Sequence, residues 1–171
     1  TDSEGEMLWE KELADDGQIS ETIYSISLSP NGHYYLCSNI NSVDSPSIYR
    51  PRLTKIGGSG NIDWQRTFVS DSRQYHEFRA IASSLGGAIL IGTSTHILSN
   101  KYNEDAFMIK IDDKGNMLWT NSYGSYDSDD WGWAVFETPL NNLVFVGSTK
   151  SFGASLFDIY LVGANSDGIS Y

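Results

Sequence analysis

The sequence predicts an all-β protein, a β-propeller segment of three four-stranded antiparallel blades. A Gly-x-x-x-Trp pentamer occurs at residues 5–9, 60–64 and 115–119, a constant spacing of 55 residues. Each repeat also contains short apolar runs separated by turns rich in Gly, Asn and Asp. No segment has the spacing of apolar residues that is typical of an amphipathic helix. A repeat of this length, built from four short strands, indicates a propeller blade.

The first repeat covers residues 5–59. We expect strands at 23–28, 33–37 and 52–56, because each is a short run rich in apolar or β-branched residues. The first pentamer precedes these runs, so residues 5–13 are expected to be a strand that completes another blade.

The second and third repeats follow the same order, over residues 60–114 and 115–171. The expected strands are 78–83, 88–92, 106–111, 117–119, 131–138, 143–148 and 157–162. Residues 168–171 would begin a further strand. The chain is therefore interpreted as one propeller segment over residues 1–171. It would be either half of a six-bladed ring that a homodimer closes, or a fragment of a larger propeller.

Composition excludes several classes of function. The chain has 22 acidic and 11 basic residues and a net charge of −11, which argues against nucleic-acid binding. No apolar run is long enough to insert into a membrane, and no signal peptide is visible. Cys37 is the single cysteine, so no intrachain disulfide is possible.

The repeats resemble a propeller repeat of secreted and cell-surface proteins of bacteria and archaea. The matching residues are Gly115-Asn116-Met117-Leu118-Trp119, Tyr123-Gly124, Asp129-Asp130 and Ser151-Phe152-Gly153. Departures from the repeat are Gly163, where a Lys is expected, and Cys37, aligned with Gly92 and Gly147. The resemblance implies an extracellular or cell-surface location. It also implies an adhesive, scaffolding or recognition role rather than a particular reaction.

Asp112, Gly115 and Trp119 are also similar to the tryptophan-docking motif of quinoprotein-type propellers. In that motif the indole stacks between neighbouring blades. The resemblance therefore implies that Trp9, Trp64 and Trp119 are structural residues between blades. A large aromatic residue at one repeat position can bury much surface at each boundary.

Long connections are predicted on one face of the blades, at 11–21, 67–76 and 121–130 and at 39–48, 93–104 and 148–156. Binding residues often lie on such loops. The candidate binding residues are Tyr75, His76, Glu77, Tyr123, Tyr126, Asp127, Asp129, Asp130 and Trp131. Aromatic residues beside carboxylates suit a glycan or a basic region of a protein. A solvated rim without a ligand is the alternative interpretation.

Catalysis is not favoured, and no catalytic residue, metal site or cofactor is predicted. His33, His76 and His96 lack metal-ligand spacing, and the sequence has neither a nucleophile elbow nor a phosphate-binding loop. The function predicted is a non-catalytic module for protein or glycan recognition or surface scaffolding. The alternatives are a glycoside hydrolase or lyase that uses Asp129 or Asp130, and a purely structural, self-assembling repeat.

Overall fold

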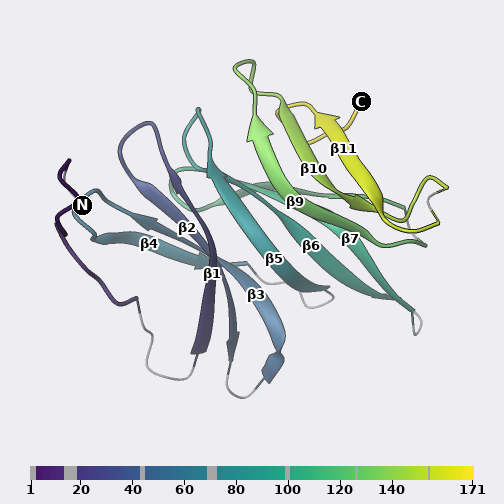
Figure 1. Cartoon of the computed structure of the whole chain (residues 1–171), viewed down its shortest axis with the longest axis horizontal. Coiled ribbons are helices and arrows are strands. Elements are labelled where there is room, and N and C mark those ends of the chain that lie inside the picture. Colours follow the sequence, from purple (N-terminus) through teal and green to yellow (C-terminus); the bar gives the residue numbers. More distant parts are fainter. Residues whose placement is uncertain are drawn as a thin grey trace.

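The computed structural model is all-β and describes residues 3–13, 19–42, 45–68, 73–98, 101–125, 127–153 and 155–171. These residues form eleven strands and no helix. The strands make three antiparallel sheets that succeed one another along the chain (Figure 1). Each sheet is built from strands that are consecutive in sequence, so every pairing is made through a short-range connection.

The first sheet has the order β1-β2-β3-β4, the second β5-β6-β7-β8, and the third β11-β10-β9. The strands of the first sheet are β1 (Ile19–Leu28), β2 (Tyr34–Ser42), β3 (Ser45–Ile56) and β4 (Ile62–Thr67). Those of the second are β5 (Arg73–Ala82), β6 (Ala88–Leu98), β7 (Lys101–Ile111) and β8 (Met117–Tyr123). Those of the third are β9 (Asp130–Glu137), β10 (Leu143–Thr149) and β11 (Asp158–Ala164).

All-β character and every strand expected between residues 23 and 162 are confirmed, but two of the predicted long loops are wrong. β6 and β7 pair without interruption from Ala88–Ile111 to Leu98–Lys101, across the segment 93–104 that was expected to be a loop. β2 and β3 likewise extend into the segment 39–48. The polar composition of both segments suggested loops, yet such residues are readily accommodated in a sheet when their backbone groups are paired.

Residues 5–13, expected to be a strand that completes another blade, belong to none of the three sheets of the single chain, and their pairing with another blade stays a prediction. At the other end of the chain, Ser170 makes an isolated bridge with Ala164 of β11, in the segment where a further strand was expected to begin.

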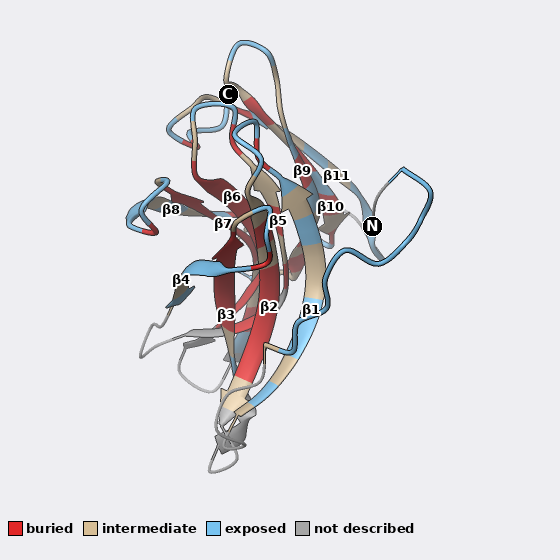
Figure 2. Ribbon diagram, turned by 90° about the vertical axis from the view of Figure 1, so that its left-hand side faces the viewer, coloured by how far each residue is buried: buried red, intermediate tan, exposed pale blue. Residues whose placement is uncertain are grey.

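The second sheet lies between the other two and packs against both. On one side Tyr35, Cys37 and Leu53 of the first sheet meet Phe78 and Leu90 of the second. On the other side the second sheet packs through a separate apolar cluster against the third. The residues of this cluster are Ile89, Ile91, Ala106, Met108, Tyr123, Val135, Leu143, Phe145 and Ala164. Figure 2 shows that burial is concentrated in the middle strands and decreases toward β1 and β4.

The first strands of the three sheets are linked directly. In β5 the backbone N–H groups of Ala80 and Ala82 donate to the hydroxyls of Ser25 and Ser27 in β1, each at 2.8 Å. Glu137, the last residue of β9, accepts bonds from the Ser83 hydroxyl and the Ser84 N–H in the turn after β5. These hydrogen bonds hold consecutive sheets side by side along β1, β5 and β9.

Each pentamer tryptophan reaches the turn of the sheet that follows it. The indole N–H groups of Trp9, Trp64 and Trp119 donate to the carbonyls of Gly58, Asp113 and Ser166 at 3.2, 3.0 and 3.2 Å. Each ring also covers a glycine of that turn. The glycines are Gly60, Gly115 and Gly168, with φ of 81°, 84° and 74°. A Cβ there would lie 2.7–3.2 Å from the ring, so close approach as well as backbone conformation requires glycine.

A charged cluster ties the first sheet to the second. Asp113, in the turn between β7 and β8, accepts bonds from Lys55 Nζ at 2.6 Å and from the Tyr35 hydroxyl at 3.0 Å. The bond from Lys55 is the largest cause that lowers the pKa of the Asp113 carboxyl, and the Tyr35 bond acts in the same direction. Burial is the first cause that raises the pKa of Tyr35, with Asp113 adding to it.

Because the folded-state pKa of Asp113 is depressed, the carboxylate stabilises the fold above its unfolded pKa, and this contribution is lost as the pH falls through the folded value. The side chain is half exposed, so the effect is about 0.5–1 kcal/mol. Asp113→Asn is therefore expected to lower the free energy of unfolding by that amount at pH 7 and by less at pH 3. Urea unfolding at both pH values measures it, with Asp167→Asn in the corresponding turn of the third sheet as control. A loss that does not shrink with acid would contradict the assignment.

Candidate binding pocket

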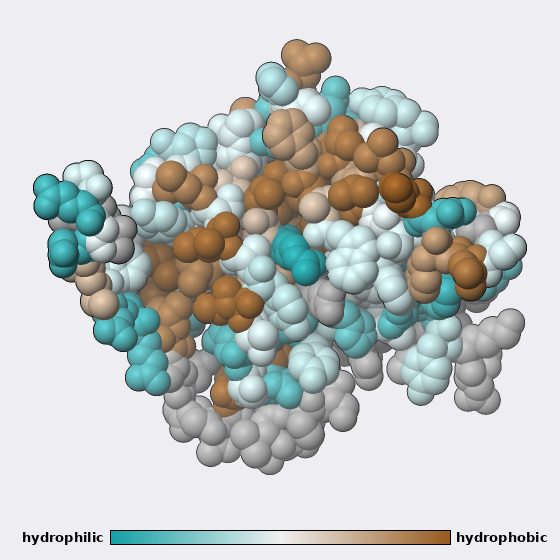
Figure 3. All heavy atoms as spheres, in the orientation of Figure 1, coloured by the Kyte–Doolittle hydropathy of each residue, from teal (hydrophilic) through white to brown (hydrophobic). Residues whose placement is uncertain are grey.

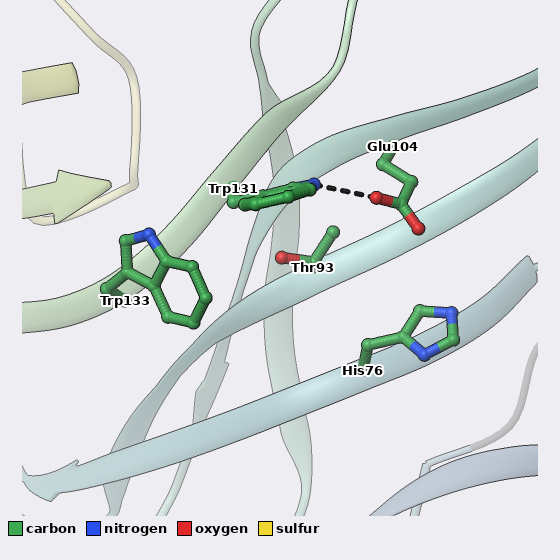
Figure 4. Close-up of a pocket in the computed structure, with 5 residues that line it drawn as sticks. All are labelled: His76, Thr93, Glu104, Trp131 and Trp133. Carbon is green, nitrogen blue, oxygen red and sulfur yellow. Dashed lines mark hydrogen bonds between the residues drawn. The ribbon is translucent and has the colours of Figure 1, made fainter. Parts of the chain in front are cut away.

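A pocket with a volume of about 290 Å³ opens between the second and third sheets. Its lining residues come from four strands: His76 from β5, Thr93 from β6, Glu104 from β7, and Trp131 and Trp133 from β9 (Figure 4). β6 and β7 extend into the segment 93–104 that was expected to be a loop, so Thr93 and Glu104 lie on paired strands. The pocket is thus formed by residues whose backbone is fixed in a sheet.

Two tryptophans form the aromatic wall of the pocket. The rings of Trp131 and Trp133 meet edge to face, with centroids 5.9 Å apart and an interplanar angle of 88°. Trp131 also packs on Phe157 at 4.2 Å. A bulge sets this arrangement, because Val146 pairs with Ala134 while Gly147 pairs with Gly132. Trp133 is left between these pairs, and such bulges redirect side chains next to functional sites.

Gly147 makes this bulge possible. A Cβ at Gly147 would overlap the backbone carbonyl of Trp131, so only glycine allows β9 and β10 to approach here. The absence of a side chain at Gly147 therefore allows the Trp131 backbone to lie close to β10.

The polar groups of the pocket are oriented by hydrogen bonds. The Trp131 indole N–H donates to Glu104 Oε2 at 2.7 Å (Figure 4). The Trp133 indole N–H donates to the Ser148 hydroxyl at 3.0 Å, and a ring nitrogen of His76 lies 3.1 Å from Thr95 Oγ1. The bond from Trp131 engages one carboxylate oxygen of Glu104. The guanidinium of Arg79 lies 5.7 Å from the Trp133 ring centroid.

Three of the sequence-predicted binding residues lie in the interior and have structural partners. Tyr75 packs against Phe78 and Phe107, which also contact each other. Tyr123 donates its hydroxyl to the Gly168 carbonyl at 2.6 Å, and burial raises the pKa of Tyr123 to about 12.

Asp130, the third of these residues, has no exposed surface. Its carboxylate accepts the Ser125 N–H at 2.9 Å, the Ser151 hydroxyl at 2.6 Å and the Thr149 hydroxyl. These bonds connect the start of β9 to the connection before it and to the end of β10, so both carboxylate oxygens are occupied within the protein.

The remaining predicted residues are divided between the pocket and its surroundings. The structure brings His76 and Trp131 together in the pocket. Asp127 accepts a bond from the Ser125 hydroxyl, and Asp129 forms an ion pair with Lys150 at 2.8 Å. Glu77 belongs to β5, with a side chain outside the described residues, and Tyr126 lies outside the described residues altogether.

Sequence reasoning missed Thr93, Glu104 and Trp133. The first two lie in the segment that was predicted to be a loop, where no side chain could be assigned a direction. Trp133 could have been found, because Trp131-Gly132-Trp133 places two large aromatics on either side of a glycine in a strand. Glycine within a strand often marks a bulge or a close approach.

Within the part of the chain that the structure describes, no group of His, Cys, Asp and Glu residues is arranged to hold a metal ion. The same described residues include no helix with the length and apolar character needed to cross a membrane.

Comparison of the sequence with models of known protein families gives no match, and comparison with curated proteins gives none either.

Proposed function

We propose that this chain is a non-catalytic β-propeller module that recognises a glycan in the pocket between the second and third sheets. The observation that carries the proposal is the pair of edge-to-face tryptophans, Trp131 and Trp133, beside the Glu104 carboxylate. Indole faces stack on the apolar faces of sugar rings, while a carboxylate and a hydroxyl accept and donate bonds to sugar hydroxyls. A volume of about 290 Å³ is near the lower limit of small-molecule sites, and fits one or two sugar rings.

The propeller assignment is supported by the repeated contacts between consecutive sheets. Trp64 of the first sheet and Trp119 of the second make the same bond to the turn of the next sheet. The first strands β1, β5 and β9 lie adjacent, as the inner strands of neighbouring blades would. The proposed location is the cell surface or the extracellular medium, on the resemblance of the repeats.

Catalysis by the two acids considered from the sequence is less well supported. Glycoside hydrolysis needs a carboxyl group that can protonate the leaving group and a second that acts as nucleophile or base. Asp130 is buried and occupied by three donors, and Asp129 is paired with Lys150. Neither carboxylate lines the pocket. Recognition without reaction therefore accounts better for the arrangement.

The test is binding of the 171-residue protein to a glycan array, followed by titration of the best saccharide. Trp133→Ala is expected to weaken binding at least about 5-fold, because an aromatic contact is worth about 1 kcal/mol or more. Glu104→Gln should weaken it less. Phe152→Ala, which removes an exposed aromatic outside the pocket, is the matched control and should bind like the parent.

Two results would contradict the proposal. One is equal affinity of the Trp133→Ala variant and the parent for the bound saccharide. The other is the appearance of new reducing ends on a polysaccharide panel, which would favour the hydrolase.

A further inference from the structure

The outer face of the third sheet, turned away from the second sheet, is apolar and exposed. Its exposed apolar side chains are Phe136, Val146, Ile159 and Leu161. Ile159 and Leu161 are 83% and 68% exposed. Figure 3 shows apolar surface gathered over β9–β11 and, separately, beside the N-terminal segment and β1. Contiguous apolar surface of this kind usually marks an interaction site.

Strand register shows which residues of the second sheet occupy the corresponding positions. Val146 pairs with Leu161, as Ile91 pairs with Met108. Val146 and Ile91 are each the fourth residue of their strand. Ile91 and Met108 are fully buried in the cluster formed with the third sheet. The outer face of the third sheet thus has the pattern of a face that packs against a following sheet.

The outer face of the first sheet has the opposite pattern. Ile26 pairs with Leu36, as Ala80 pairs with Leu90 in the second sheet. Ala80 and Leu90 are buried against the sheet that precedes them, whereas Ile26 is 64% exposed. Ile26 and Leu36 line an apolar pocket of about 360 Å³, together with Trp9, Ile23 and Tyr34. This face therefore corresponds to one that packs against a preceding sheet.

We propose that the third sheet of one copy of this chain docks on the first sheet of a second copy, and that the same contact made twice closes a ring of two copies. The two faces differ, so the contact is head to tail, and such contacts close into rings when the rotation permits. A second copy is the occupant because the new contact continues the two sheet-to-sheet interfaces already present in each chain. The proposal does not depend on glycan binding.

Trp9 has a definite place in this arrangement. It donates to Gly58 and covers Gly60 of the first sheet, as Trp64 and Trp119 do for the second and third. Residues 5–13 therefore lie where the last strand of a preceding sheet would contribute its tryptophan. In the ring, this segment comes next to β11, whose pairing within the described chain is with β10 and, at Ala164, with Ser170.

The first measurement is molar mass by size-exclusion chromatography with light scattering. Two copies of net charge −11 repel one another, so the dimer is expected to tighten between 0.15 and 0.5 M salt. Leu161→Asp is expected to weaken the dimer roughly 100-fold or more, because a charge would be buried without a partner. Leu140→Asp, at a position 81% exposed in the turn after β9, is the matched control and should leave the dimer intact.

The second measurement fixes the orientation of the two copies. The Ala80 N–H to Ser25 hydroxyl contact within the chain has an expected equivalent between Ala134 of one copy and Ile26 of the other. A mixture of Ala134→Cys and Ile26→Cys proteins should form a covalent dimer under mild oxidation. A mixture of Leu140→Cys and Ile26→Cys should not. Native Cys37 is fully buried and does not compete.

A monomer at every concentration and salt would overturn the proposal, as would open polymers without a closed dimer. A dimer that both Leu161→Asp and Ile26→Asp leave intact would also overturn it, since the contact would then lie elsewhere. Glycan binding by a monomer would leave the recognition proposal standing while refuting this one.

Discussion

Asp130→Ala is expected to lower the free energy of unfolding by about 3–4 kcal/mol. The substitution removes a fully buried carboxylate that accepts bonds from Ser125, Thr149 and Ser151. Leaving a buried donor without an acceptor costs about 1–3 kcal/mol, and three donors lose their acceptor here, of which two hydroxyls can rotate to other partners. The effect is large because the Ser125 backbone N–H cannot do so.

Equilibrium urea unfolding of the parent protein and of Asp130→Ala measures this difference in the free energy of unfolding. Asp129→Ala is the control at the neighbouring position. It breaks an ion pair with Lys150 that is partly exposed, and it should cost about 1 kcal/mol or less. Similar losses for the two variants would show that the buried network contributes little. Asp130 does not line the candidate pocket, so a large loss of stability in Asp130→Ala would indicate a structural role of this residue.

Gly147→Ala is expected to destabilise the protein by about 3 kcal/mol and to weaken ligand binding in the fraction that folds. The added methyl group would overlap the Trp131 carbonyl, so β9 and β10 must separate at the bulge. Overpacking of this kind costs about 1–3 kcal/mol, and an overlap with rigid backbone lies at the upper end. Because the bulge positions Trp131 and Trp133, near-ultraviolet circular dichroism should change as well.

The matched control is Gly163→Ala in β11. A Cβ there would have its nearest neighbour, in the Tyr171 ring, at 3.7 Å, which is an ordinary contact. This variant should lie within about 0.5 kcal/mol of the parent. Equal stability of the Gly147 and Gly163 variants would mean that the strands relax at the bulge without cost.

The strands were predictable because their apolar residues lie inside the sheets and their turns carry glycine. Leu90 and Ile109, for example, fall in short apolar runs that end at turns. The long hairpins were not predictable, because Thr93, Ser94 and Thr95 are polar and yet buried where β6 and β7 extend. Their burial depends on neighbouring sheets, which composition alone does not reveal.

Register also corrects one alignment made from the sequence. Cys37 pairs with Leu53, as Ile91 pairs with Met108, so Cys37 corresponds to Ile91. Ser38, rather than Cys37, corresponds to Gly92. The hairpin turns β1–β2 and β5–β6 have equal length, but the connection from β2 to β3 is one residue shorter than that from β6 to β7. This difference shifted the sequence alignment, and only the pairing register reveals it.

The site was predictable only in part. Two of the predicted binding residues, His76 and Trp131, do line the candidate pocket. Tyr75, Tyr123 and Asp130 were expected on exposed loops, but they are buried. Aromatic and acidic residues near a turn have the same appearance in sequence whether they face solvent or close a core. The difference lies in their partners, such as the Gly168 carbonyl that receives the Tyr123 hydroxyl 45 residues later.

The tryptophan contacts between sheets have a consequence for the order in which the chain folds. Each indole binds a carbonyl that lies 49, 49 or 47 residues further along the chain. During synthesis the first sheet can pair its strands, but Trp64 has no acceptor until Asp113 has left the ribosome, and Trp119 must wait for Ser166. Each sheet therefore gains its full stability only after the next has emerged, just as the units of repeat proteins are stabilised by their neighbours. During synthesis, the sheet made most recently therefore lacks the tryptophan contact with the sheet that follows it.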